Sequence, residues 1–113
     1  MKKINLMIIA LLCICMNVSA NTWIQKANVG GSIRREAVGF SIGNKGYIGT
    51  GWNGALPAYL DFWEYDPATN SWTQKANFGG SARYYAVGFS IGTNGYIGTG
   101  FDGAYKNDFW EYN

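Results

Sequence analysis

The stretch that decides the fold is AVGFSIGNKGYIGTG, residues 37–51, which returns as AVGFSIGTNGYIGTG at residues 86–100. Within it, Val38, Phe40 and Ile42 alternate with small residues. This period of two predicts a β-strand with one large apolar face and one small face. The glycines and asparagine that follow predict a tight hairpin before a second, glycine-rich strand. The chain therefore carries two copies of one β-hairpin.

The repeated unit extends beyond the hairpin on both sides. WIQKANVGGS at residues 23–32 matches WTQKANFGGS at residues 72–81, and DFWEY stands at residues 61–65 and 108–112. The DPATN segment after the first DFWEY predicts a turn, because proline presets φ and Asp and Asn bond local backbone groups. Each full unit is expected to contain four strands, called a, b, c and d, which in the first copy are residues 37–42, 47–51, 61–65 and 71–76.

These motifs resemble the kelch repeat. The shared features are a glycine pair at residues 30–31 and 79–80, an apolar strand, GYIGTG, and Tyr65 followed seven residues later by Trp72. The likeness covers nearly all of residues 23–113, and bacterial secreted kelch proteins with DFWEYDP-type repeats are most similar. It implies an all-β fold of two four-stranded propeller blades, in the strand order d-abc-d-abc. One departure is that GTG stands where many kelch repeats have a bare glycine pair.

The first 20 residues are predicted to be a signal peptide. Lys2 and Lys3 precede an apolar run over residues 4–18, and Val18-Ser19-Ala20 has small residues at the positions that signal peptidase reads. The run is shorter than the roughly 20 residues that span a bilayer, which favours cleavage after Ala20 over an uncleaved anchor. The protein is therefore expected to be secreted or periplasmic.

Composition argues against several classes of function. The chain has nine basic and seven acidic residues, and loss of Lys2 and Lys3 with the signal peptide makes the two signs equal. Nucleic acid and anionic membranes both favour a basic surface, so neither is expected as a partner. The chain has no histidine, and Cys13 and Cys15 lie in the expected signal peptide. We therefore expect no catalytic triad, no zinc or copper site and no cofactor.

The expected organisation is a signal peptide at residues 1–20, kelch repeat 1 at residues 21–70 and kelch repeat 2 at residues 71–113. Each repeat opens on a d strand, so Trp23 has no tyrosine before it and Tyr112 has no tryptophan after it. Two blades cannot close a ring, because propellers have about four to eight. Four arrangements stay open: a homo-oligomer built head to tail, in which three chains give six blades, a part of a longer propeller, an open monomer, or a different small β structure.

The loops between strands d and a, and between b and c, carry most differences between the two copies. That pattern is typical of a rigid scaffold with a varied binding surface. Aromatic residues in these loops could stack on a sugar or anchor a protein, and Arg34 and Arg83 could grip a carboxylate or tie loops together. The candidate ligand-binding residues are Arg34, Arg35, Glu36, Trp52, Asn53, Arg83, Tyr84, Tyr85, Phe101 and Asp102.

Two functions follow from the kelch likeness. The first is non-catalytic binding of a protein or glycan. The second is part of a carbohydrate-active kelch enzyme such as a sialic-acid mutarotase, for which Glu36 would be the carboxylate acid or base. The counterpart of Glu36 is Tyr85, so such a site would be asymmetric. The copper-radical sugar oxidases of the family need histidine ligands, which this chain lacks.

Overall fold

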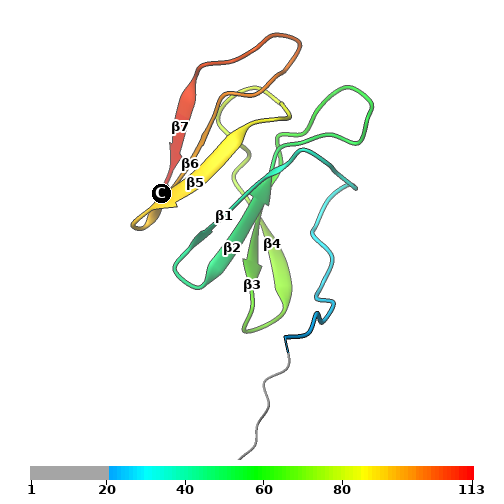
Figure 1. Ribbon diagram of the computed structural model, residues 1–113, viewed down its shortest axis with the longest axis vertical. Coiled ribbons are helices and arrows are strands. Elements are labelled where there is room, and N and C mark those ends of the chain that lie inside the picture. The colour runs from blue at the N-terminus through cyan, green and yellow to red at the C-terminus, as the bar shows by residue number, and fades with distance from the viewer. Residues whose placement is uncertain (1–20) are drawn as a thin grey trace, which may run out of the picture.

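The computed structural model describes residues 21–113, and this part of the chain is all-β (Figure 1). Seven strands form two antiparallel sheets, β1-β2-β3-β4 and β5-β6-β7. The strands are β1 (Val38–Ile42), β2 (Lys45–Gly49), β3 (Phe62–Asp66), β4 (Ser71–Lys75), β5 (Val87–Ile91), β6 (Asn94–Gly98) and β7 (Phe109–Tyr112). The all-β expectation is confirmed. The expected signal peptide lies outside the described residues, among which no helix is long and apolar enough to cross a membrane.

The strand boundaries follow the local sequence closely. The β1–β2 turn contains only Gly43 and Asn44, so β2 starts at Lys45, two residues earlier than expected. Thr50 has a φ of 57° and therefore ends β2 before the GTG segment is complete. Its counterpart Thr99 has a φ of 61° and ends β6 in the same way.

The strand expected over residues 23–28 does not form in the single chain, so the second sheet has three strands rather than four. Only β6 pairs with β7. The N-terminal segment lies beside the first sheet instead (Figure 1), where Ala27 accepts a hydrogen bond from Trp72 Nε1 at 3.0 Å and donates to Asn70 Oδ1 at 2.9 Å. Within its own sheet, the edge of β3 is closed to this segment, because β4 already pairs with β3.

The core lies between the two sheets, which pack face to face. Val38 and Phe40 of β1 contact Gly88 and Gly95 of the second sheet so closely that a Cβ on either glycine would clash. Glycine therefore serves here as a packing residue that admits a large side chain from the facing strand. The buried core residues are Val38, Tyr47, Phe62, Phe78 and Ile97.

Candidate functional site

All the long connections lie at one end of the sheets, which we call the loop end. Because the paired strands run antiparallel, residues 50–61 and 76–86 emerge beside each other, and residues 99–108 follow the same course in the second sheet. The short turns of the hairpins lie at the opposite end (Figure 1). Every candidate ligand-binding residue is in a loop-end segment, so the fold brings together residues that the sequence separates by up to 68 positions.

Arg34 and Arg83 lie beneath the loop end rather than on its surface. The Arg83 side chain is 1% exposed and donates to Asp108 Oδ1 at 2.5 Å and Asp108 Oδ2 at 2.8 Å. Arg34 makes the equivalent pair with Asp61 at 2.9 Å and 2.6 Å. The same guanidinium groups donate to the carbonyl oxygens of their threonines, Thr50 and Thr99. Both arginines therefore tie loops together, and neither presents its charge to a ligand.

The carboxylates of these pairs stay ionised far into the acid range. Hydrogen bonds from Arg83 and from Trp110 Nε1 hold the pKa of Asp108 well below its ordinary value. Burial alone would raise the pKa of Asp61, but hydrogen bonds from Arg34 and Trp63 outweigh burial and the net shift is downward. Each pair is thus a charged, bidentate clamp at neutral pH.

The exposed part of the loop end is built around an aromatic stack between the two repeats. The rings of Trp52 and Tyr84 lie 4.4 Å apart at an angle of 9°. The guanidinium of Arg35 lies 5.0 Å from the centroid of the Trp52 ring, on which it can make a cation–π contact. Phe101 and Tyr85 pack against Tyr84 at 5.6 Å and 5.2 Å. We call these five residues the aromatic cluster.

Glu36 is the single carboxylate that touches the aromatic cluster among the contacts of the described residues. It accepts a hydrogen bond from Trp52 Nε1 and lies 3.8 Å from Arg35 Nε. The negative charge of Glu36 and a hydrogen bond to it raise the pKa of the Tyr85 hydroxyl. Glu36 and Tyr85 occupy the same place in the two copies and both have a positive φ, 56° and 59°. Such backbone is uncommon outside glycine and is often retained at functional sites.

Backbone hydrogen bonds between the repeats fix the aromatic cluster. Gly51 N donates to Arg83 O at 2.8 Å, and Tyr85 N donates to Glu36 O at 3.2 Å. These bonds join the connection before β5 to the connections that flank β1 and β2. The aromatic cluster is therefore preorganised, which lowers the entropy cost of binding a ligand there.

Asn53 and Asp102 lie at the margin of the loop end, where Asn53 bonds within its own loop and Asp102 bonds both within its loop and to the β4–β5 connection. Asn53 Oδ1 accepts from Ala55 N at 3.0 Å. Asp102 accepts from Ser81 Oγ at 2.6 Å and pairs with Lys106 at 2.9 Å. The hydrogen bonds from Ser81 and Lys106 lower the pKa of Asp102 to about 2. Sequence reasoning assigned both residues to these loops but did not foresee that hydrogen bonds within the protein already engage them.

One exposed aromatic residue at the loop end was missed by sequence reasoning. Tyr105 packs edge-on against Phe101 at 5.2 Å and is otherwise exposed. It lies in the loop whose length differs between the copies, and that length change was the available signal. A hollow of about 360 Å³ also opens at this end, and its lining residues are Leu56, Pro57, Ala58, Ser81, Ala82 and Asp102. Residues 21–113 contain no group of acidic, histidine or cysteine side chains that could hold a metal ion.

Comparison with known proteins bears on the fold. No protein-family model and no curated protein sequence matches this chain. The solved "Structure of YjhT" is similar, with a TM-score of 0.63 at 22% sequence identity. The match covers 74% of this chain and 26% of that chain, so the matched part spans about a quarter of that protein. At this identity the likeness concerns the fold.

Proposed function

We propose that this chain is a secreted kelch-type β-propeller unit that binds a protein or a glycan at its loop end, without catalysis. The two sheets would be successive blades of the propeller. The kelch motifs, the face-to-face packing of the sheets and the fold likeness to a longer chain support this assignment.

The observation that carries the binding function is the aromatic cluster. It combines rings from both repeats with the exposed side chains of Arg35 and Tyr85. Aromatic faces bind the apolar face of a sugar or the side chains of a protein, and arginine supplies paired donors for a hydroxyl or carboxylate. Because Arg34 and Arg83 are buried, Arg35 is the arginine available to such a ligand.

A carbohydrate-active enzyme is the alternative, and Glu36 is the residue that favours it. Its carboxylate lies among aromatic rings beside Tyr85, and a carboxylate held in place can act as a general acid or base. Against this, the Glu36 carboxylate is already bonded to Trp52 and Arg35. It would have to release one of these partners to reach a substrate.

A glycan array followed by titration of any hit tests the binding function. Tyr85→Asn is the informative variant, because asparagine tolerates the positive φ while the ring is lost. We expect a loss of affinity of about 30-fold or more, the size of a binding hot spot. Thr69→Ala, in the β3–β4 turn at the opposite end, is the matched control and should bind normally.

Anomerisation of free sugars, followed by NMR, separates the enzyme from the binding module. Binding without turnover supports the proposal. Turnover that Glu36→Gln abolishes would establish the enzyme instead. Binding that survives both Tyr85→Asn and Arg35→Gln would remove the loop end as the site.

A further inference from the structure

Each sheet has one face of large apolar side chains, which we call the large face. On the opposite face, which we call the small face, two glycines leave space beside an isoleucine, a tryptophan and a tyrosine. In the core, the large face of the first sheet packs on the small face of the second. Those large-face residues are Val38, Phe40, Tyr47 and Phe62, and those small-face residues are Gly88, Gly95, Ile97 and Tyr112. Among residues 21–113, no other sheet packs on the large face of the second sheet or on the glycines of the small face of the first.

The unpartnered large face exposes side chains that the equivalent face buries. Val87 is 57% exposed, whereas its counterpart Val38 is 4% exposed. Phe109 is 59% exposed, whereas Phe62 is 2% exposed. The rings on this face already hold the stacked geometry of the core, because Phe89–Tyr96 and Tyr96–Phe109 lie 5.7 Å and 5.5 Å apart. A contiguous exposed apolar face of this kind marks an interaction surface.

The unpartnered small face has the space that a large face requires. At Gly95, an added Cβ would lie 2.2 Å from the Phe40 ring, and at Gly88 it would lie 2.0 Å from Val38. At the counterparts Gly46 and Gly39, the nearest atoms are 3.8 Å and 3.6 Å away and belong to the same sheet. The small face of the first sheet thus has the same two glycines, but in the described part of the chain no side chain from another sheet packs against them.

The two unpartnered faces match residue for residue the two faces that already pack together. Gly39, Gly46, Ile48 and Tyr65 stand where Gly88, Gly95, Ile97 and Tyr112 stand, and Val87, Phe89, Tyr96 and Phe109 stand where Val38, Phe40, Tyr47 and Phe62 stand. All eight pairs are identical in residue type. The partner that fits both faces is another copy of this chain.

The free edge of β7 is matched in the same way by the N-terminal segment. In the first sheet, β4 pairs with β3 so that Tyr65 lies opposite Trp72, with their rings 5.1 Å apart, and Lys75 pairs with Glu64 at 3.2 Å. The residues that correspond to Trp72 and Lys75 are Trp23 and Lys26, and both are exposed. By analogy, Trp23 would pack against Tyr112 of β7, and Lys26 would pair with Glu111 of β7.

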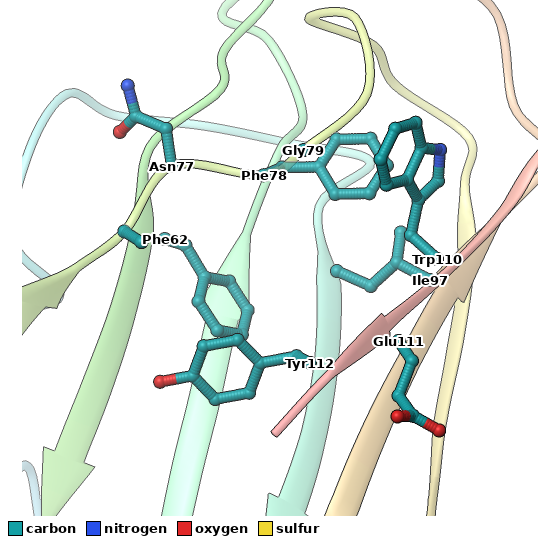
Figure 2. A pocket seen from close by; sticks show the side chains of 9 residues that line it. Phe62, Asn77, Phe78, Gly79, Ile97, Trp110, Glu111 and Tyr112 are labelled. Carbon is teal, nitrogen blue, oxygen red and sulfur yellow. The ribbon is translucent and has the colours of Figure 1, made fainter.

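A pocket marks where this strand would arrive. It has a volume of about 200 Å³ and is lined from both sheets, by Phe62 of β3, by Phe78, and by Trp110 and Tyr112 of β7 among others (Figure 2). Its apolar lining includes Tyr112, the residue that would face Trp23. In the single chain, the segment is held away from β7 by two solvent-exposed hydrogen bonds of Ala27, one with Asn70 of the β3–β4 turn and one with Trp72 of β4.

We propose that copies of this chain bind head to tail, with the large face of the second sheet packed on the small face of the first sheet of the next copy. Residues 22–26 of that next copy add to β7 as its fourth strand. One copy can make both contacts at once. Within the chain, β4 completes the first sheet and leads directly into β5 of the second sheet, and residues 22–26 would lead into β1 of the next copy in the same way. The contact is heterologous, so it closes into a ring when the rotation per copy permits. Three copies would give a ring of six blades.

The same assembly would change the loop end. Where Trp52 stacks on Tyr84 within the chain, Phe101 would meet Arg35 of the next copy, which is a cation–π pair. Thr50, which is fully buried beside the repeat junction, has an exposed counterpart in Thr99 that the next copy would cover. Aromatic and arginine clusters would therefore alternate around the ring, each completed by a neighbouring copy. This inference concerns assembly alone and does not depend on a ligand.

Light scattering on the full chain, coupled to gel filtration, tests the assembly. We expect one discrete species of two to four chains, the range that gives four to eight blades. Gly46→Leu should be folded by circular dichroism, since its side chain has room in the single chain, but should weaken assembly by about tenfold or more through overpacking. Thr93→Leu, an exposed change in the β5–β6 turn, is the control and should assemble as the parent does. A parent chain that stays monomeric, or an oligomer that Gly46→Leu leaves intact, would overturn the proposal.

Disulfide trapping tests the strand register separately. Ile24 corresponds to Thr73, which lies opposite Glu64, so Ile24 should lie opposite Glu111 of the neighbouring copy. Two chains, one with Ile24→Cys and one with Glu111→Cys, are mixed with Cys13 and Cys15 replaced by serine. A cross-linked dimer supports the proposal, because paired positions fall within disulfide reach. Absence of that dimer, or equal cross-linking of Ile24→Cys to Phe109→Cys, would refute the register.

Discussion

Replacing Asp108 with asparagine should destabilise the fold by about 2–3 kcal/mol. The variant keeps the size of the side chain but removes the charge that faces Arg83, which is 1% exposed. Removing one partner of a buried ion pair costs about 3–5 kcal/mol, because the other charge stays buried and uncompensated. Asp108 itself is 37% exposed, so solvent screens part of the interaction and the lower figure is appropriate.

Urea unfolding followed by tryptophan fluorescence measures this loss at a fixed protein concentration. Asp66→Asn is the matched control, because Asp66 pairs with Lys45 at the exposed turn and asparagine can still accept the hydrogen bond from Ala68 N. Loss of that surface ion pair should cost much less, because exposed ion pairs contribute little to stability. Equal losses for the two variants, or a loss below about 0.5 kcal/mol for Asp108→Asn, would refute the reasoning.

The pH dependence of the same variant gives an independent check. The pKa of Asp108 is lowered in the folded state, so its stabilising effect is fully present above the unfolded pKa of about 4. That effect declines as the pH falls from there toward the folded pKa. The difference in unfolding free energy between the parent and Asp108→Asn should therefore shrink between about pH 4 and pH 2. A difference that grows on acidification would contradict the charge-based account.

Three further predictions concern single positions. Thr50→Val should stabilise the fold by about 1 kcal/mol in urea unfolding, because the Thr50 hydroxyl is buried without a hydrogen-bond partner in the described structure. Gly95→Ala should cost about 1–3 kcal/mol through overpacking, whereas Gly46→Ala should stay within about 0.5 kcal/mol at concentrations where the chain is monomeric. Glu36→Gln should lower the pKa of Tyr85 toward its ordinary value, which ultraviolet titration of the tyrosines can follow.

The sheets were predictable from sequence because their information is local. Alternation in the AVGFSI segment and the short glycine-asparagine turn determine the β1–β2 hairpin, and the repeat transfers it to β5 and β6. Strand ends were less predictable, since the φ of Thr50 depends on contacts with the neighbouring repeat. The strand expected at Trp23 does not form in the single chain, because β4, which has nearly the same sequence, already occupies the edge of β3.

At the candidate site too, local features were predictable from sequence and contacts between distant residues were not. Equivalent positions in the two copies indicated a shared role for Arg34 and Arg83, but their carboxylate partners lie 27 and 25 residues away. No spacing rule identifies such a pair. The stack of Trp52 on Tyr84 joins different repeats and was equally out of reach, although both residues had been singled out. The sequence differences between the two copies indicated that the loop end is the candidate binding surface. Only the packing showed that Arg34 and Arg83 tie loops together while Arg35 and Tyr85 are exposed.

The near identity of the two hairpins also matters while the chain is still unfolded. Because β2 and β6 have nearly the same sequence, β1 could pair with either of them. Its native partner lies across a two-residue turn, whereas β6 lies about fifty residues further along, and the entropy of closing that longer loop costs on the order of 3 kcal/mol more. Hairpins also close within about 1–10 μs. Proximity along the chain therefore favours the native partner over one with nearly the same sequence, and the short turns let each hairpin form before strands of different repeats can pair.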